Sequence, residues 1–548
     1  MNFQKHLFWA ACITVLINAA AMFSPVINSG DAITYAALAQ HIAQSHDWAR
    51  LMLDGQDWLD KPHLPFWITA LSFKLGGVGA FTYILPGFLF HLIGAYYTYR
   101  IARLFYDKPT AALAVLIYVS VFNLMDAGIE VKAETYLVGE IMPACYYWLR
   151  YDARFRVKHL LLGAAFTAMA VMTKGIFTLI TISSGLVCLW FYRKQWGRPF
   201  SPKWLAALLL SLLFITPELA ALHLQFSRQA SLAGPGQPVS VFRFFFWDSQ
   251  FGRFFNTGPI QNHNGHPLYF VLVFLWAFLP WTLVFFAAVY ANFRTFKAAD
   301  ARERAALVFL CGAFCPTFLM FSATQFQFDY YTDIIFPFAA IFCARYLAVT
   351  AVGRRLSIAQ TGLAVLLVLL AAALAGYVMN RTLLAVIAVA AVVLVFYCHA
   401  TRAESRNFRA IICPVLAIDM VYLFLTLLTA TTFVHYGVAH NAAKLFGKQS
   451  LVPVYVYQMP EVARELALYS KAPCYEVDSA SYLQQVKGRY RLIVRQDQAQ
   501  QLHLDPPRYA RVSEMRLVVH KTGTFNKLLQ LAKGTWPLET IDFLQTSG

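Results

Sequence analysis

The amino-acid sequence predicts a polytopic α-helical membrane protein of about 13 transmembrane helices, followed by a small α/β domain. Of the 548 residues, 59% are hydrophobic and only 13% are charged, a composition outside the range of soluble globular domains. Apolar runs long enough to cross a hydrocarbon core of about 30 Å recur from Leu7 to about Val434 and then stop. We therefore divide the chain into a membrane domain, residues 1–433, and a tail domain, residues 434–548.

Polar breaks separate 13 apolar spans in the membrane domain. They cover residues 7–27, 81–104, 109–124, 134–150, 159–172, 175–192, 203–223, 267–291, 304–321, 329–349, 356–378, 382–400 and 409–432. The first span is preceded by Lys5, as in a signal peptide. However, it is long and no small-residue cleavage site follows it, so we interpret it as a retained helix.

The net charge of +17 reflects membrane topology rather than nucleic-acid binding, because the Lys and Arg residues are concentrated in every second polar break between the spans. Every second break is basic, and these breaks together with Lys5 hold 22 Lys or Arg, whereas the intervening breaks hold nine. Cytoplasmic loops carry the excess of Lys and Arg. The N-terminus is therefore predicted in the cytoplasm and the tail domain on the outer side.

Two polar segments on the predicted outer side are long. Residues 28–80 have amphipathic patterns around Ile33–Ile42 and Leu64–Leu75, which predict helices lying in the membrane interface, with Asp31 as the N-cap of the first. Within this segment, DWLDKPHLPFW combines two prolines with three aromatic residues around Lys61. Such a stiff, interfacial stretch would hold the lysine in a fixed direction. The second segment is a loop at 224–266.

The tail domain has short β-branched and aromatic runs at 452–457, 473–477, 490–495 and 515–520, separated by two helical stretches. This pattern predicts a small α/β domain without a recognisable catalytic motif. The nine cysteines form neither a disulfide framework nor a C-x-x-C metal motif.

Charged residues next to apolar spans are the candidates for chemistry, because isolated charge there is costly and is usually paired or functional. Asp31, Glu134 and Lys174 are of this kind, although each alone could be an interfacial cap or anchor. An outer-face transferase needs a donor that reaches it through the membrane, typically a group on a polyprenyl phosphate. Lysine and arginine would stabilise the charge that grows on the leaving phosphate, and a carboxylate would take the proton of an attacking hydroxyl.

An ordered set of motifs resembles the GT-C membrane glycosyltransferases, and in particular the branch of protein mannosyltransferases and lipid A aminoarabinose transferases. The motifs are Asp31 with Tyr35, D-K-P-x-L-x-F-W at 60–67, T-K-G at 173–175, Q-F-G-R-F at 250–254, H-P-L-Y-F at 266–270, L-P-W at 279–281 and D-Y-Y-x-x-x-x-F-P at 329–337. The resemblance runs across nearly the whole chain. It implies a GT-C fold in a bacterial inner membrane, with a periplasmic tail domain.

The resemblance also implies roles for individual residues. Asp31 and Glu134 match the catalytic carboxylates, although the second acid is commonly Asp in this branch. The positions implied to bind the donor phosphate are Lys61, Lys174, Arg253, Tyr330, Tyr331 and, as a weaker candidate, His266. Tyr35, Asp60 and His63 are expected to contact substrate. His63 replaces the second proline of the family's K-P-P motif, so both a packing role and a ligand-binding role are open for it. The tyrosine pair Tyr330 and Tyr331 could instead belong to an interfacial aromatic belt.

We expect the chain to transfer a sugar from a polyprenyl-phosphate donor to a periplasmic acceptor, most consistently lipid A or another lipopolysaccharide component. A protein or other glycan acceptor is the enzymatic alternative, and a lipid or solute transporter is the alternative from another class. A transporter would place ionisable residues near the middle of its spans, whereas here the polar residues gather at one interface. Some relatives use a divalent cation between acids, but His263 and His266, three residues apart in a loop, are a poor metal signature.

Overall fold

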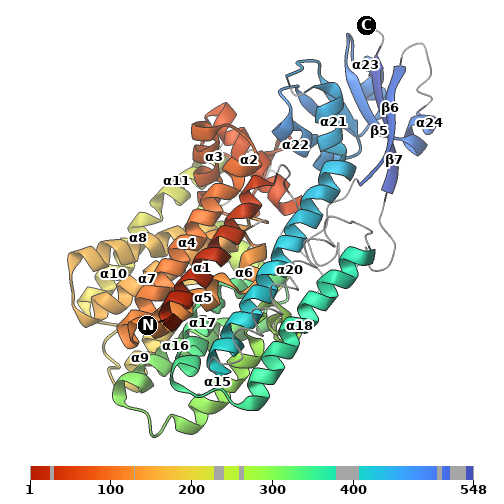
Figure 1. Ribbon diagram of the computed structural model, residues 1–548. Coiled ribbons are helices and arrows are strands. Elements are labelled where there is room, and N and C mark those ends of the chain that lie inside the picture. Colours follow the sequence, from red (N-terminus) through yellow and green to blue (C-terminus); the bar gives the residue numbers. More distant parts are fainter. Residues whose placement is uncertain are drawn as a thin grey trace.

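The computed structural model shows a bundle of long helices with a small mixed α/β domain at one end (Figure 1). It describes residues 2–24, 27, 30–128, 130–227, 240–257, 265–377, 406–447, 449–502, 509–518 and 538–546. The predicted span at 382–400 and His263 lie outside the described residues. The N-terminus lies at the end of the bundle opposite the α/β domain.

The helices of the bundle follow the predicted apolar runs closely. They are α1 (Asn2–Ala20), η1 (Ala21–Phe23), α4 (Ala80–Phe105), α5 (Lys108–Val119), α6 (Phe122–Asp126), α7 (Ala133–Ala153), α8 (Val157–Lys174), α9 (Thr178–Tyr192), α10 (Pro202–Phe214), α11 (Thr216–Ser227), α14 (Tyr269–Ala277), α15 (Thr282–Thr295), α16 (Ala301–Ala323), η3 (Asp329–Ile335), α17 (Phe336–Val349), α18 (Arg354–Tyr377) and α20 (Arg406–Tyr436). Within the described ranges, six helices are long and apolar enough to cross a membrane alone, or seven if one bent pair is a single span. The count of 13 spans stays a prediction.

Several predicted spans are interrupted. The run at 267–291 forms α14 and α15, which meet at an angle of 110°. The run at 109–124 divides into α5 and α6, and the run at 329–349 opens with the 3₁₀ helix η3 before α17. These interruptions place irregular backbone inside the bundle, which is tolerated at membrane depth where it lines a cavity or is buried in protein. Both η3 and α6 border the site described below.

The segment at 28–80 contains two helices, α2 (Gly30–Ser45) and α3 (Leu64–Gly76), and the two short strands β1 (Met52–Leu53) and β2 (Gln56–Asp57). The buried face of α2 includes Ile33, Leu38 and Ile42, as the amphipathic pattern predicts. One detail of the prediction is wrong. The helix already begins at Gly30, so Asp31 lies in its first turn rather than at the N-cap, where a carboxylate still interacts favourably with the helix dipole.

Three short helical segments follow in the described part of the polar segment at 224–266. They are α12 (Val241–Arg243), the π-helix η2 (Phe244–Asp248) and α13 (Ser249–Phe254). Phe245 is buried against the ends of α8 and α11, in a cluster with Val171 and Leu222. This packing fixes α13, and with it Arg253, beside the end of α8.

The tail domain is a five-stranded mixed sheet with the strand order β4-β3-β5-β7-β6. Its strands are β3 (Val454–Tyr457), β4 (Cys474–Val477), β5 (Arg491–Arg495), β6 (Tyr509–Val518) and β7 (Leu538–Thr546), and its helices are α21 (Val438–Phe446), α22 (Pro460–Tyr469), α23 (Ala480–Gln485) and α24 (Gln496–Gln501). β3 pairs in parallel with β4 and β5, and β7 is antiparallel to β5 and β6. Four strands match the predicted runs, while β7 was not predicted.

The tail domain packs on the helix that carries Asp31. Helix α22 lies against α2. Tyr469 accepts a hydrogen bond from the backbone N–H of Ile27 at 2.8 Å, Gln40 donates to the carbonyl of Ala467 at 2.9 Å, and Arg464 pairs with Asp54. The domain therefore braces the start of α2 from outside the bundle.

Candidate active site

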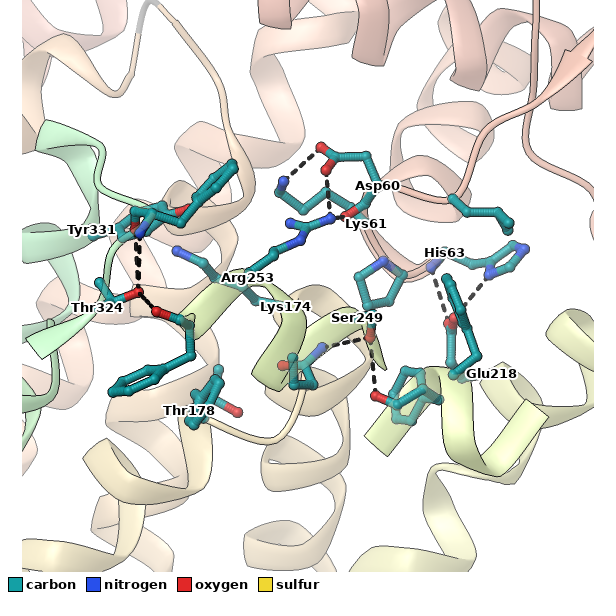
Figure 2. A pocket seen from close by; sticks show the side chains of 18 of the residues that line it. Asp60, Lys61, His63, Lys174, Thr178, Glu218, Ser249, Arg253, Thr324 and Tyr331 are labelled. Atoms are coloured by element: carbon teal, nitrogen blue, oxygen red, sulfur yellow. Dashed lines mark hydrogen bonds and ion pairs between the residues drawn. The ribbon is translucent and has the colours of Figure 1, made fainter. Parts of the chain in front are cut away.

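Two cavities lie next to each other at the end of the bundle that faces α2 and α3. The first, which we call the cationic cavity, is bordered by Lys61, Lys174, Arg253 and Tyr331, together with apolar side chains of η2, α13 and α16 (Figure 2). The second, the acidic cavity, measures about 530 Å³ and is lined by Asp31, Asp126, Glu130, Lys132, Glu134, Asp329, Tyr330 and Asp333. Nine of the 11 sequence-predicted residues border one of the two cavities.

Asp60 connects two cations of the cationic cavity. Its carboxylate accepts hydrogen bonds from Lys61 at 2.7 Å and from Arg253 at 2.5 Å, and its carbonyl accepts a second bond from Arg253 (Figure 2). Lys61 and Arg253 are 192 positions apart in the sequence, and each side chain is less than one-fifth exposed. One carboxylate cannot neutralise two cations, so the cluster keeps a net positive charge that an anion could use.

The pKa values of this cluster reflect its excess of positive charge. Burial raises the pKa of Asp60, but Lys61 and Arg253 outweigh it and bring the value below the ordinary range. For Lys61, burial lowers the pKa, and the nearby charge of Arg253 lowers it further, while Asp60 opposes both. A phosphate group here would relieve the repulsion between the two cations.

Lys174 joins the two cavities. It lies at the end of α8, its ammonium group pairs with Glu134 of the acidic cavity, and it stands 3.5 Å above the centre of the Tyr331 ring. The position after Lys174 requires a glycine. Gly175 has a φ of +104°, and a Cβ atom there would lie 2.2 Å from the side chain of Gln250 on α13. The T-K-G motif therefore lets α8 end in close contact with α13.

The acidic cavity holds six carboxyl groups and one lysine among its described lining residues. Lys132 pairs with Glu130 at 3.2 Å and lies 4.2 Å from the centre of the Tyr330 ring. Although burial lowers the pKa of Lys132, the surrounding acids raise it above its ordinary value, so this lysine stays charged. The side chain of Asp31 is exposed to solvent at the cavity. The surrounding protein still removes enough water to raise the pKa of its carboxyl group, although the positive charges of Lys132 and Lys61 act to lower that pKa.

Two carboxyl oxygens in the acidic cavity have no hydrogen-bond partner among the described residues. Glu134 and Asp333 are each 1% exposed. Glu134 uses Oε1 for Lys174, and Asp333 uses Oδ1 to accept from Asn123 at 2.6 Å, which leaves Glu134 Oε2 and Asp333 Oδ2 without protein donors in this part of the chain. Buried polar atoms are normally satisfied, so each oxygen is a place where a ligand could donate a hydrogen bond.

His63 departs from the expected K-P-P motif and forms a fully buried pair with Glu218 of α11 (Figure 2). The carboxylate of Glu218 accepts from the backbone N–H of His63 at 3.0 Å and contacts Nδ1 of its ring at 2.9 Å. The other ring nitrogen, Nε2, lies 3.2 Å from the carbonyl of Ala49. Both residues border the cationic cavity, but their polar atoms are used within the protein, so the geometry favours a packing role that holds the loop after Lys61.

Two predicted residues lie outside the described lining of both cavities. Tyr35 packs its ring among Phe66 and Trp58, with centroids 5.0 and 6.1 Å away, beneath the loop that carries Lys61. Burial, and then the negative charges of Asp60 and Asp31, raise the pKa of Tyr35 well above its ordinary value, so its hydroxyl group stays protonated. His266 is exposed, and its backbone N–H donates to Gln327 at 2.9 Å. Neither residue lines a described cavity, and the contacts of Tyr35 with substrate and of His266 with phosphate stay predictions.

The structure adds residues that the sequence patterns do not single out. Lys132 and Asp333 are two among many charges of the predicted outer face, and Glu218 lies inside the predicted span 203–223. The signal for Glu218 is a single acid in an apolar run, which is rare unless it is paired. Two further buried acids in predicted spans, Glu140 and Asp419, accept hydrogen bonds from Thr173 and Thr14 at 2.9 and 2.8 Å.

The described part of the chain contains no group of three or more His, Cys, Asp or Glu arranged to hold a metal ion. The divalent cation considered from the sequence stays an expectation. In this structure, Lys61, Lys174 and Arg253 supply the positive charge of the cationic cavity.

Comparison with protein families and curated proteins supports the resemblance seen in the motifs. Residues 60–220 match the model of the dolichyl-phosphate-mannose-protein mannosyltransferase family. The undecaprenyl phosphate-alpha-4-amino-4-deoxy-L-arabinose arabinosyl transferase of Edwardsiella ictaluri is 25% identical over 349 residues, covering 62% of this chain and 59% of that protein. The enzyme of the same name from Pseudomonas aeruginosa strain UCBPP-PA14 is 25% identical, covering 52% of this chain and 50% of that one. The matched region thus spans about half of each relative's length.

The fold itself matches a solved structure over nearly its full length. The crystal structure of ArnT from Cupriavidus metallidurans bound to undecaprenyl phosphate superposes with a TM-score of 0.72, at 16% identity, and covers 98% of each chain. Its apo structure gives the same TM-score at 15% identity. The expected resemblance to ArnT-like GT-C membrane glycosyltransferases is confirmed, and the chain has their fold.

Proposed function

We propose that this chain is a glycosyltransferase of a bacterial inner membrane that moves a sugar from undecaprenyl phosphate to a lipid A-type acceptor on the periplasmic side. The observation that carries the proposal is the pairing of a cationic cavity with an acidic cavity through the Lys174–Glu134 contact. The relatives named above act with an undecaprenyl-phosphate sugar, and the fold is that of a protein solved with undecaprenyl phosphate bound.

The donor phosphate fits the cationic cavity. Lys61 and Arg253 both pair with the carboxylate of Asp60. Each has further N–H groups that can donate hydrogen bonds to a phosphate oxygen. When the bond between the sugar carbon and the phosphate oxygen breaks, its electron pair stays on the phosphate, and the added charge is stabilised by the same cations. Because they interact more strongly with the departing phosphate than with the intact donor, they lower the barrier and do not merely bind substrate.

A carboxylate must accept the proton of the attacking acceptor hydroxyl. Asp31 and Glu134 both line the acidic cavity, next to the proposed phosphate site. Glu134 is already paired with Lys174, whereas Asp31 has a raised pKa and access to solvent from which an acceptor could enter. We assign the role of base to Asp31, and we assign to Glu134 the orientation of Lys174 and of the sugar.

We further propose that the transferred sugar carries an amino group, as in the names of the relatives. The acidic cavity offers the unpartnered oxygens of Glu134 and Asp333, which suit a protonated amine. A neutral sugar, or an N-formylated one with its single N–H, could donate a hydrogen bond but would bring no positive charge to these oxygens, and the lost charge-assisted contact discriminates between substrates.

The test is reconstitution of the full chain in liposomes with an undecaprenyl-phosphate amino sugar and lipid A, followed by mass spectrometry of lipid A. The expected result is addition of one sugar mass, lost in Lys61→Ala. Transport of labelled donor without a product would support the transporter alternative instead. For the amino group, the N-formylated donor should react about tenfold more slowly or worse. Asp333→Asn should reduce this preference, while Asp419→Asn, a buried acid outside both cavities, should not.

A further inference from the structure

A third cavity lies between α15, α16 and α17, away from the two cavities of the proposed active site. It measures about 810 Å³, and none of its described lining residues borders either of the other two cavities. Its wall is formed mainly by phenylalanine and aliphatic side chains, among them Phe285, Phe314 and Phe342. Cys311, Cys315 and Phe293 also line it and are exposed, so the cavity opens to the outer surface of the bundle.

One end of this cavity is polar and positively charged. Arg294 and Lys297 lie there at the end of α15, and the described lining contains no acidic residue. Asn292, which precedes them on α15, also lines the cavity, and its Nδ2 atom is buried without a hydrogen-bond partner among the described residues. The charge bias of cytoplasmic loops would explain the two cations, but it would not explain an unsatisfied amide donor beside them.

The dimensions of the cavity suit one leaflet of a bilayer. Along α15 it extends from Phe285 to Lys297, and at 1.5 Å per residue this distance is about 18 Å. Half of a hydrocarbon core is about 15 Å thick. A chain lying in this cavity from the charged end inward would therefore reach roughly the middle of the membrane.

We propose that this cavity binds an anionic phospholipid of the surrounding leaflet. Its headgroup phosphate contacts Arg294, Lys297 and the amide of Asn292, and one acyl chain fills the apolar part between α15 and α16. The occupant packs against α17, which continues directly from η3, the segment that carries Tyr330 and Tyr331. Bound lipid would therefore brace the helix behind the proposed active site without entering it.

The experiment is native mass spectrometry of the full chain, purified in detergent and titrated with phosphatidylglycerol or phosphatidylcholine. Each juxtamembrane cation contributes about a factor of five to anionic-lipid binding, so the double variant Arg294→Gln/Lys297→Gln should bind phosphatidylglycerol about 30-fold more weakly. The matched control is Arg156→Gln/Lys158→Gln, which removes two exposed cations from another basic break that does not line this cavity.

A second variant tests the apolar part of the cavity. Cys315→Trp places a large ring into the cavity from an exposed position and should weaken the binding of phosphatidylglycerol while leaving the fold intact. Equal retention of phosphatidylglycerol and phosphatidylcholine, or equal losses in the two double variants, would overturn the proposal. Neither result depends on transferase activity, so the proposal stands or fails separately from the proposed function.

Discussion

His63 and Glu218 form a buried pair in which one carboxylate holds both the backbone and the ring of the histidine. The second ring nitrogen, Nε2, lies 3.2 Å from the carbonyl of Ala49, so both ring nitrogens of His63 have partners within the protein. Lys61 is only two residues away. The pair therefore connects α11 to the loop that positions the proposed phosphate-binding lysine.

We expect Glu218→Ala to destabilise the protein and to impair donor binding, because it leaves the buried backbone N–H and ring Nδ1 of His63 without their partner. Removing one member of a buried pair costs about 3–5 kcal/mol. The double variant His63→Pro/Glu218→Leu should recover most of this loss. Proline has no N–H to satisfy, and His63 has a φ of −76°, which proline can adopt. Thermal unfolding of both variants in detergent measures the difference, and equal destabilisation would contradict the role of the pair in holding this loop.

Lys61→Ala should raise KM for the polyprenyl-phosphate donor and lower kcat. The loss of a charge-assisted contact to phosphate corresponds to about 2–3 kcal/mol in kcat/KM, or roughly 30- to 150-fold. Lys74→Ala is the matched control. Lys74 lies on α3 in the same segment, residues 28–80, but it contacts His46 and Trp48 and is not among the described lining residues of the site. Similar kinetic losses in both variants would argue for a general effect of charge instead.

The rate should depend on the ionisation of Asp31. As the proposed base, it acts only when deprotonated, so activity is present above its pKa and is lost as the pH falls through it. Burial raises this pKa above the ordinary value of 3.8, so the loss should begin at a higher pH than for an exposed aspartate. Asp31→Asn should reduce kcat by about 10²- to 10⁴-fold. If the residual activity keeps the same acid limb, Glu134 is the base.

Gly175→Ala should disturb Lys174 and Arg253 together. An alanine at φ +104° is strained by about 1–2 kcal/mol, and its Cβ would also collide with Gln250, at the point where α8 and α13 meet. We expect a reduced kcat/KM with a smaller loss of thermal stability. Gly197→Ala is the control, since no described atom lies within 4 Å of a Cβ there. Unchanged kinetics in Gly175→Ala would show that the close contact is dispensable.

Asn123→Ala tests the hydrogen bond that orients Asp333. Without the donor at 2.6 Å, the Asp333 carboxyl group loses the hydrogen bond that holds its Oδ1 atom and can rotate in the acidic cavity. We expect a weaker preference for the amino sugar over its N-formylated form, with donor phosphate binding unchanged. Competition between the two donors, read by mass spectrometry of the product, measures this ratio. An unchanged ratio would remove Asp333 from substrate recognition.

The class of fold and the kinds of residue at the site follow from the amino-acid sequence alone. The hydrocarbon core requires about 20 mostly apolar residues per span and a helix that satisfies its own backbone hydrogen bonds, and both requirements act locally along the chain. Ordered motifs likewise identify Lys61, Lys174 and Arg253 as candidates. The tail strands β3 to β6 are also predicted from local patterns, whereas β7 has the polar residues Glu539, Thr540 and Asp542 among its apolar ones and no such clear pattern.

How these residues combine depends on the packing of the bundle. Asp60 bridges Lys61 and Arg253, Lys174 reaches Glu134, and Glu218 of an apolar helix holds His63. These contacts join segments that are far apart in the chain, and their strength depends on how much water the packed bundle removes. Sequence patterns report the cost of placing a charge next to lipid. They do not report which opposite charge the packing brings within reach, and the packing placed these residues in two cavities, one cationic and one acidic.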